Sequence, residues 1–215
     1  NGLFLAQHEE STMQGAILAS SSRLYLSHGR QQPQVYSRRT GQRIGSIGKS
    51  GDGGCFALLT PDEVLIHGAG QNHGVKGELR GFDAQTDDRM ATFPQANCMI
   101  VQASMAYLHS NGRLSALDRQ KNIQFQAQKM QLETQVESDK KKFKKLDDPR
   151  GESEEGKTLL QKIAEGQTQM KELEERISKT LIWKRDVPFY HTLIQAGDTL
   201  LAGGKNQIVA HKAST

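Results

Sequence analysis

Apolar and polar positions follow the same pattern in four stretches of this chain. Each stretch has an apolar run, a short polar turn and a second alternating run that ends at a glycine or a histidine. The four stretches are Gly15–His28, Gly54–His67, Asn97–His109 and Tyr190–Gly203. Further short runs follow them, beginning at Pro33, Gly77, Gly112 and Asn206. Alternation with a period of two predicts strands, and the polar segments predict the turns between them.

The spacing of these stretches indicates a repeat protein. Gly15 and Cys55 stand 40 residues apart, and Cys55 and Cys98 stand 43 residues apart. Self-similarity at this period, built from short strands, is typical of a β-propeller, in which each blade is a four-stranded antiparallel sheet. We therefore expect residues 1–119 and 180–215 to form about three to four blades of a partial propeller. Open strand edges would then need a cover, which either further sequence or a second copy of the chain would supply.

Residues 120–179 have a different composition and interrupt the third copy. They are rich in Gln, Glu and Lys and contain two stripes with alternating four- and three-residue spacing. The first stripe is Phe125, Lys129, Leu132, Val136, Asp139, Phe143 and Leu146. The second is Leu159, Ile163, Gly166, Met170, Leu173, Ile177 and Thr180.

The segment between the two stripes contains Pro149 and Gly151, which break helices. The pattern therefore predicts an inserted antiparallel α-helical coiled-coil hairpin with arms of ~22 residues. Lys129, Asp139 and Gly166 interrupt the apolar stripes, so we expect them to weaken the hairpin.

Composition changes this picture little. The chain has 215 residues with 28 Lys and Arg against 24 Asp and Glu, and the resulting net charge of +4 predicts no particular partner. No apolar stretch approaches the ~18 residues that span a bilayer, so we expect no membrane span. Two cysteines do not make a disulfide framework.

Three strand segments resemble one known repeat. They are Val35–Gln42, Leu79–Thr86 and Ile182–Lys184, and together they are similar to the PQQ-like repeat of quinoprotein-type and BamB-like propellers. The resemblance covers roughly residues 12–119 and 180–215, and it indicates fold much better than function. It implies a protein from an extracytoplasmic compartment, such as the periplasm.

The resemblance also implies two classes of function. Catalytic members of the group carry adjacent cysteines, a tryptophan platform under the quinone and a calcium site. This chain has no adjacent cysteines, and Trp183 stands where the repeat places a packing aromatic residue. We therefore expect a non-catalytic interaction or assembly scaffold without a cofactor, which binds other proteins or a second copy of itself and uses the coiled-coil hairpin as a docking or oligomerisation arm. The alternatives are a redox or metal-dependent protein that uses PQQ or a metal, and an accessory propeller domain of a larger enzyme.

Three side chains are candidate metal ligands. Aligning the copies by eye places Gly15, Cys55, Cys98 and His191 at one equivalent position, at the start of the strand nearest the propeller axis. Equivalent positions converge around that axis, and two thiolates with an imidazole suit a soft metal. The two thiols could instead form a disulfide or, as buried cysteines commonly do, serve only in packing.

A run of positive charge marks the end of the first predicted helix. It consists of Lys140, Lys141, Lys142, Phe143, Lys144 and Lys145. Such a run can contact phosphate or an acidic surface. We favour a solvated helix face that is neutralised by Glu152, Glu154 and Glu155 on the returning arm. Nucleic-acid binding needs interleaved aromatic residues and a larger net charge, so we do not expect it.

Overall fold

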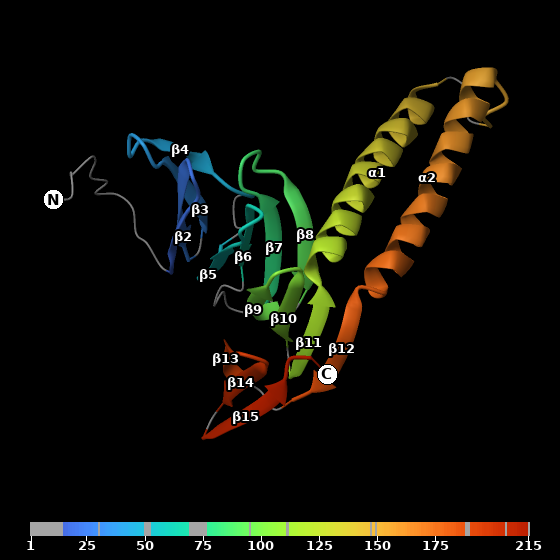
Figure 1. Cartoon of the computed structure of the whole chain (residues 1–215). Helices are drawn as coiled ribbons and strands as arrows, with labels where there is room; N and C mark the ends of the chain where they lie inside the picture. Colours follow the sequence, from blue (N-terminus) through green and yellow to red (C-terminus); the bar gives the residue numbers. More distant parts are fainter. Residues whose placement is uncertain are drawn as a thin grey trace.

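The structure is a computed structural model. It describes residues 15–29, 31–49, 53–68, 77–94, 96–110, 112–146, 148, 150–187, 190–204 and 206–214, without the side chains of residues 110, 190 and 191. Within these ranges the strands form three four-stranded antiparallel sheets and one three-stranded sheet. The sheets follow one another as blades along an arc, and a long helical hairpin projects from the third (Figure 1).

The blades follow the chain in order. Blade 1 holds β1 (Ile17–Ala19), β2 (Arg23–His28), β3 (Gln31–Ser37) and β4 (Arg43–Ser46). Blade 2 holds β5 (Phe56–Leu59), β6 (Val64–Gly68), β7 (Glu78–Asp83) and β8 (Arg89–Pro94). Blade 3 holds β9 (Ala96–Gln102), β10 (Met105–Ser110), β11 (Arg113–Asp118) and β12 (Leu181–Asp186). Blade 4 holds β13 (Tyr190–Ala196), β14 (Thr199–Gly204) and β15 (Gln207–Lys212).

One backbone hydrogen bond recurs in all four blades. The N–H that follows the third strand donates to a carbonyl in the turn between the first two strands. The donor and acceptor pairs are Arg38 and Ser22, Ala84 and Glu63, Arg119 and Ser104, and Ala213 and Asp198. Because each pair has the same offsets from its strands, these bonds fix which residues are equivalent from blade to blade.

Apolar side chains between neighbouring blades form the core. The cluster between blades 1 and 2 contains Tyr25, Val35, Leu65 and Phe82. The cluster between blades 2 and 3 contains Ile66, Phe93, Met99 and Leu108. The cluster between blades 3 and 4 contains Tyr107, Leu114, Leu200 and Ala202. Since an inner blade is covered on both faces, every residue of β6 is buried, as a near-continuous apolar strand predicts.

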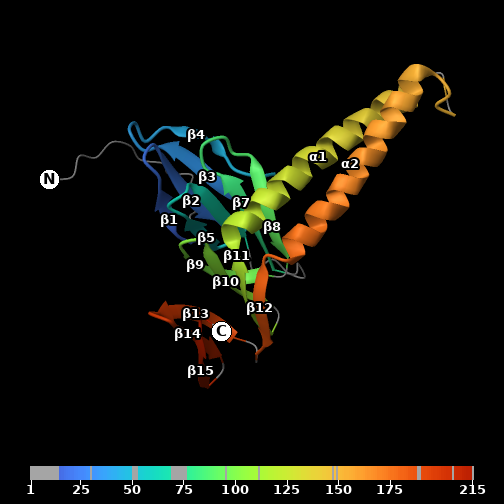
Figure 2. The same ribbon diagram turned by 45° about the vertical axis from the view of Figure 1, so that its right-hand side comes forward.

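The helical hairpin takes the place of the turn between β11 and β12. Helix α1 (Arg119–Lys145) begins at the cap residue Asp118, whose side chain accepts a hydrogen bond from the Lys121 N–H. Helix α2 (Glu154–Ser178) begins at Ser153, whose side chain accepts from the Gly156 N–H. These N-caps satisfy backbone donors that the helices leave free. The two helices run side by side away from the blades (Figure 2).

Gly166 and Lys129 each take part in a contact across the seam of the hairpin. Gly166 is buried, and a Cβ there would collide with the Val136 side chain, so glycine lets the helices approach closely. Lys129 Nζ lies 2.8 Å from Glu174 Oε1 on the opposite helix. These contacts show how the two residues sit between the helices, and the expectation that they weaken the hairpin stays a prediction. Asp139 is buried and accepts a hydrogen bond from Gln135 on its own helix.

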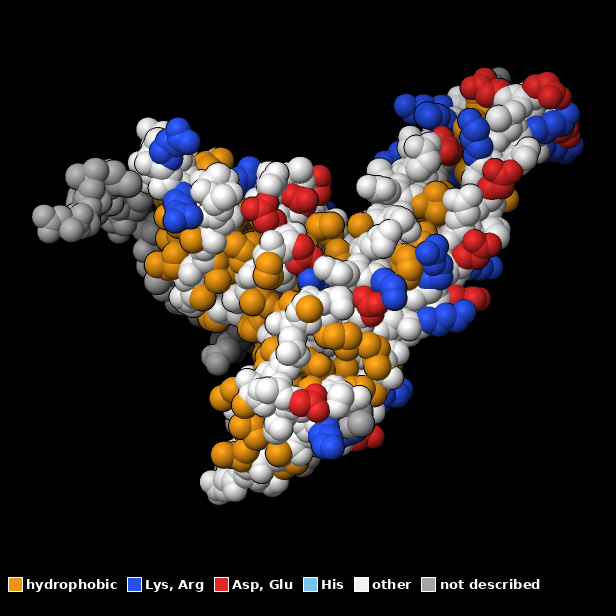
Figure 3. Space-filling view, in the orientation of Figure 1, with side chains coloured by type: hydrophobic (Ala, Val, Ile, Leu, Met, Phe, Trp, Pro, Cys, Tyr) orange, Lys and Arg blue, Asp and Glu red, His pale blue; other side chains and the backbone are white. Residues whose placement is uncertain are grey.

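The predicted fold class is confirmed: the chain is a partial propeller of antiparallel blades with an inserted helical hairpin. The helical arms have 27 and 25 residues, longer than the ~22 expected at helical rise from the stripes. Among the described residues, neither helix is long and apolar enough to cross a membrane. Hydrophobic side chains gather over the blades, whereas charged side chains of both signs cover the hairpin (Figure 3).

Candidate functional site

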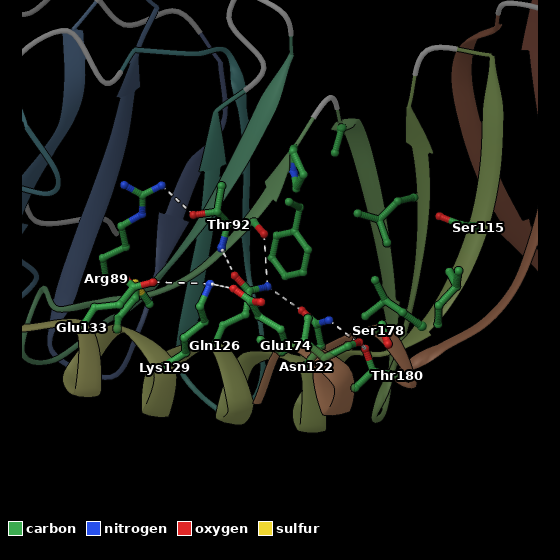
Figure 4. A pocket seen from close by; sticks show the side chains of 18 residues that line it. Arg89, Thr92, Ser115, Asn122, Gln126, Lys129, Glu133, Glu174, Ser178 and Thr180 are labelled. Carbon is green, nitrogen blue, oxygen red and sulfur yellow. Dashed lines mark hydrogen bonds and ion pairs between the residues drawn. The ribbon is translucent and has the colours of Figure 1, made fainter. Parts of the chain in front are cut away.

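A cleft of about 720 Å³ lies where the hairpin joins the blades. The outer strand β8, blade 3 and the first turns of the hairpin enclose it (Figure 4). Its apolar lining consists of Phe93, Pro94, Ala96, Leu108, Leu117, Met130, Ile177 and Leu181. Concave sites with an apolar floor and a few polar groups are the usual places for ligands and partner side chains.

A chain of side-chain hydrogen bonds crosses the cleft from blade 2 to the end of the hairpin. Gln126 accepts from the Thr92 backbone N–H at 2.9 Å and donates to the Thr92 carbonyl at 3.1 Å. Its amide also donates to Asn122 Oδ1 at 2.7 Å, and Asn122 Nδ2 donates to Thr180 Oγ1 at 2.7 Å. Thr180 Oγ1 donates in turn to the Ile177 carbonyl. The two ends of the hairpin are thus held to the edge of blade 2.

The charged groups around the cleft are paired with one another. Lys129 lies 2.8 Å from Glu174 and 3.4 Å from Glu133. The hydrogen bond to Glu174 is the main reason why the pKa of Lys129 is raised, and the same bond lowers the pKa of Glu174. Arg89 donates to Thr92 Oγ1 and lies 3.6 Å from Glu78. The cleft therefore presents an apolar floor with a rim of paired charges.

Arg119 is the second anchor of the hairpin. Its buried guanidinium donates through Nη2 to both carboxylate oxygens of Asp62, at 2.9 and 3.0 Å, and to the Ala103 carbonyl. Burial acts to raise the pKa of Asp62, but hydrogen bonds from Thr60 and Arg119 hold that pKa below its ordinary value. Nε and Nη1 of Arg119 find no acceptor among the described residues. Arg119 joins the start of α1 to two blades at once.

The predicted metal ligands lie at the starts of three successive blades. Cys55 is exposed just before β5, and Cys98 is half-buried in β9, where burial raises the pKa of its thiol. His191 lies in β13, but its side chain is outside the described part of the structure. Among the described residues, no group of three or more His, Cys, Asp or Glu side chains is placed to hold a metal. The site of Cys55, Cys98 and His191 stays a prediction.

The strand registers correct the alignment on which that prediction depended. Leu58 pairs with Ile66 and Ile100 pairs with Tyr107, so Cys98 is equivalent to Phe56 rather than to Cys55. Leu58 and Ile66 stand eight residues apart, whereas Ile100 and Tyr107 stand seven apart, so the turn between β9 and β10 is one residue shorter and an alignment that matches the two cysteines is displaced by one residue. Successive side chains alternate between the faces of a strand, so one residue decides which face Cys98 occupies.

The lysine run lies at the far end of α1, remote from the cleft in sequence and along the rod (Figure 1). Lys140 pairs with Glu137 at 2.9 Å and Lys142 with Asp139 at 3.4 Å, both on the same helix. Of the acidic residues expected to neutralise the run, Glu154 pairs with Lys157 of its own helix and Glu152 lies 4.0 Å from Arg150. Of the remaining members, Lys141, Lys144 and Lys145 are exposed, and Phe143 is half-buried.

Sequence reasoning missed the residues that build the cleft. Asn122 and Gln126 stand four residues apart, a spacing that places two side chains on one face of a helix. The spacing of Asn122 and Gln126 could be seen in the sequence. The residue that Gln126 binds could not, because Thr92 lies 34 residues away in blade 2. Arg119 gave no distinct signal, because the equivalent position holds an arginine in blade 1, Arg38, and alanines in blades 2 and 4.

The comparisons with known proteins agree with the fold. No protein-family model and no curated protein matches the chain. Among solved structures, the computationally designed Ika4 protein matches with a TM-score of 0.56 and 9% identity, over 99% of both chains. BamB from Moraxella catarrhalis matches with a TM-score of 0.54 and 12% identity, over 97% of this chain and 49% of that one.

A second designed protein, Ika8, matches with a TM-score of 0.54 and 8% identity. That match covers 95% of this chain and 46% of Ika8. This chain therefore spans about half the length of BamB and of Ika8. Structural similarity at these low sequence identities establishes the propeller fold. Function has to be argued from the residues of the site.

Proposed function

We propose that this chain is a non-catalytic interaction scaffold on a PQQ-like propeller, and that the cleft at the base of the hairpin is its docking site. The observation that carries the proposal is the Gln126 bridge, which fixes the hairpin to blade 2 beside an apolar cleft. A binding surface gains affinity when its parts are held in place before the partner arrives.

The chemistry of the cleft favours a partner that inserts apolar side chains from a helix or a loop. At Thr92 the edge of β8 is already occupied by Gln126, so an added strand would have to displace that amide. The ionic groups on the rim, Arg89, Lys129, Glu133 and Glu174, sum to no net charge. A partner therefore needs apolar anchors more than a complementary charge.

Two parts of the proposal come from the sequence resemblance. Similarity of three strand segments to the PQQ-like repeat supports membership of that group, and the likeness to BamB supports the same fold. The group is mostly extracytoplasmic, so the proposal includes a periplasmic or equivalent location. Fractionation of the source cells would test the location independently of the cleft.

Affinity purification from the source cells tests the docking site, with neighbouring residues of β12 as a matched pair. Leu181 is exposed and lines the cleft, whereas Ile182 is exposed outside it. Leu181→Lys should lose the proteins that the unaltered chain retains, because a lysine head would enter the apolar floor. Ile182→Lys should retain them. Equal retention by both variants would overturn the proposed docking site, and a stoichiometric metal or a quinone spectrum would overturn the absence of a cofactor.

A further inference from the structure

The outward faces of the two end blades are apolar in the same way as the buried faces between blades. We propose that a second copy of this chain covers both faces, so that two four-bladed halves close one ring. This inference concerns blades 1 and 4 and does not depend on the cleft. It follows from comparing residues that the recurring hydrogen bonds make equivalent.

The first of these faces is on blade 1. Leu65, Ala106 and Leu200 occupy one equivalent position, face the preceding blade and are fully buried. Leu24 occupies the same position in blade 1 and is only half-buried. Its strand neighbour Ala19 is exposed. Within the described residues, blade 1 thus carries the apolar residues of a blade interface, and no described blade covers them.

The second face is on blade 4. Tyr25, Ile66 and Tyr107 face the following blade and are buried, whereas their equivalent Leu201 is only half-buried. Ile194, which pairs with Leu201, is 60% exposed, and Ile208 on the same face is 77% exposed. Ala210 continues the row beside Leu201. Large apolar side chains placed together on a surface mark an interaction site.

The inner interfaces show how a covering blade would sit. Leu18 and Leu59 share the cluster between blades 1 and 2, and their equivalents Leu58 and Val101 share the next cluster. The equivalent of Leu18 in blade 4 is Ile194, and the equivalent of Leu59 in blade 1 is Ala19. The same packing therefore places Ile194 of one chain against Ala19 of the next.

A second copy fits because it supplies both complementary faces. Blade 4 of each chain would cover blade 1 of the other, and a twofold axis makes the two contacts identical and leaves no end face open. The comparisons agree on size: this chain covers 99% of Ika4 but only 46% of Ika8 and 49% of BamB. The parts of Ika8 and BamB that this chain leaves uncovered are about as long as this chain itself.

Native mass spectrometry with a pair of charge variants tests the inference. The unaltered chain should have twice its mass of 23.8 kDa. Ile194→Lys and Ala19→Glu should each be monomeric, because each puts a charge into the apolar contact. Mixing the two in equal amounts should restore a dimer of one chain of each kind, in which lysine meets glutamate. Restoration also shows that both variants fold.

The matched control is Ile182→Lys, since Ile182 is 55% exposed but lies outside both end faces. This variant should stay dimeric. An unaltered chain that is monomeric at the highest soluble concentration would overturn the inference, as would a control that dissociates as fully as Ile194→Lys. A mixture of the two charge variants that stays monomeric would overturn the proposed contact between Ile194 and Ala19.

Discussion

The side-chain amide of Gln126 forms two hydrogen bonds with the backbone of Thr92, one with its N–H and one with its carbonyl. A side chain of helix α1 thus forms the two backbone hydrogen bonds that a neighbouring strand would otherwise form with β8. The contact protects the edge of β8 and sets the position of α1 against blade 2. Exposed strand edges attract unwanted pairing, and covering them with a helix is one established solution.

Replacing Gln126 by alanine should therefore loosen the base of the hairpin. Loss of the two hydrogen bonds to Thr92 and of the one to Asn122 should lower the free energy of unfolding by about 1–3 kcal/mol. Urea denaturation would measure this change. Gln124→Ala is the matched control, because Gln124 is exposed on the same helix. Faster hydrogen exchange at the Thr92 amide is expected in the first variant only, and equal exchange in both would contradict the role of Gln126.

The contact between Arg119 and Asp62 should make stability depend on pH. The pKa of folded Asp62 is lowered, so the unfolded chain takes up the proton at higher pH than the folded chain does. The stabilisation is fully present above the unfolded pKa of about 3.9 and is lost as pH falls through the lower folded value. The difference in unfolding free energy between the unaltered chain and Asp62→Asn should shrink below about pH 4. A gap that stays constant down to pH 3 would count against this account.

Gly166 gives a test of the helix seam. Alanine favours helix more than glycine does, yet its Cβ would collide with Val136. Gly166→Ala should therefore destabilise the hairpin by about 1–3 kcal/mol, the usual cost of overpacking. The double variant Gly166→Ala with Val136→Ala should recover part of that loss, because the colliding methyl groups are gone. Thermal unfolding followed by helical circular dichroism would show both effects, and a stabilising single variant would refute the close approach.

The lysine run should matter little to folding. Lys141, Lys144 and Lys145 are exposed, and surface changes of this kind usually alter stability by less than about 0.5 kcal/mol. Changing all three to glutamine should leave the urea midpoint nearly unchanged. The unaltered chain should also show no binding to duplex DNA at physiological salt. A strong, salt-dependent affinity for DNA would reverse our interpretation of this run.

The propeller architecture could be predicted from the sequence because the same alternation of apolar and polar positions recurs in four copies. Leu65, Ala106 and Leu200 stand at one point of the pattern, and all three are buried between blades. The helices begin at Arg119 and end at Ser178, against an insert expected at residues 120–179. Local patterns of this kind can be recognised because secondary structure and burial both follow from them.

The side-chain contacts that build the cleft could not be predicted from the sequence pattern. Gln126 meets Thr92 across 34 residues, and Asn122 meets Thr180 across 58. Such pairs depend on how the hairpin leaves its blade, which no local pattern records. The role of Gly166 was equally out of reach, because a missing side chain can either weaken a seam or let it close, and the nearness of Val136 is not recorded in any local pattern. Cys98 was misaligned because the turn between β9 and β10 is one residue shorter than the turn between β5 and β6.

Site-specific photo-crosslinking in the source cells would test the central claim most directly. A photoreactive phenylalanine analogue at Met130 would face the cleft, and the same group at the exposed Gln161 on α2 would face solvent. The account predicts a discrete protein crosslink from position 130 that Leu181→Lys abolishes, and none from position 161. Crosslinks of equal yield from both positions, or a crosslink from position 130 that survives Leu181→Lys, would contradict the claim that the cleft is a docking site.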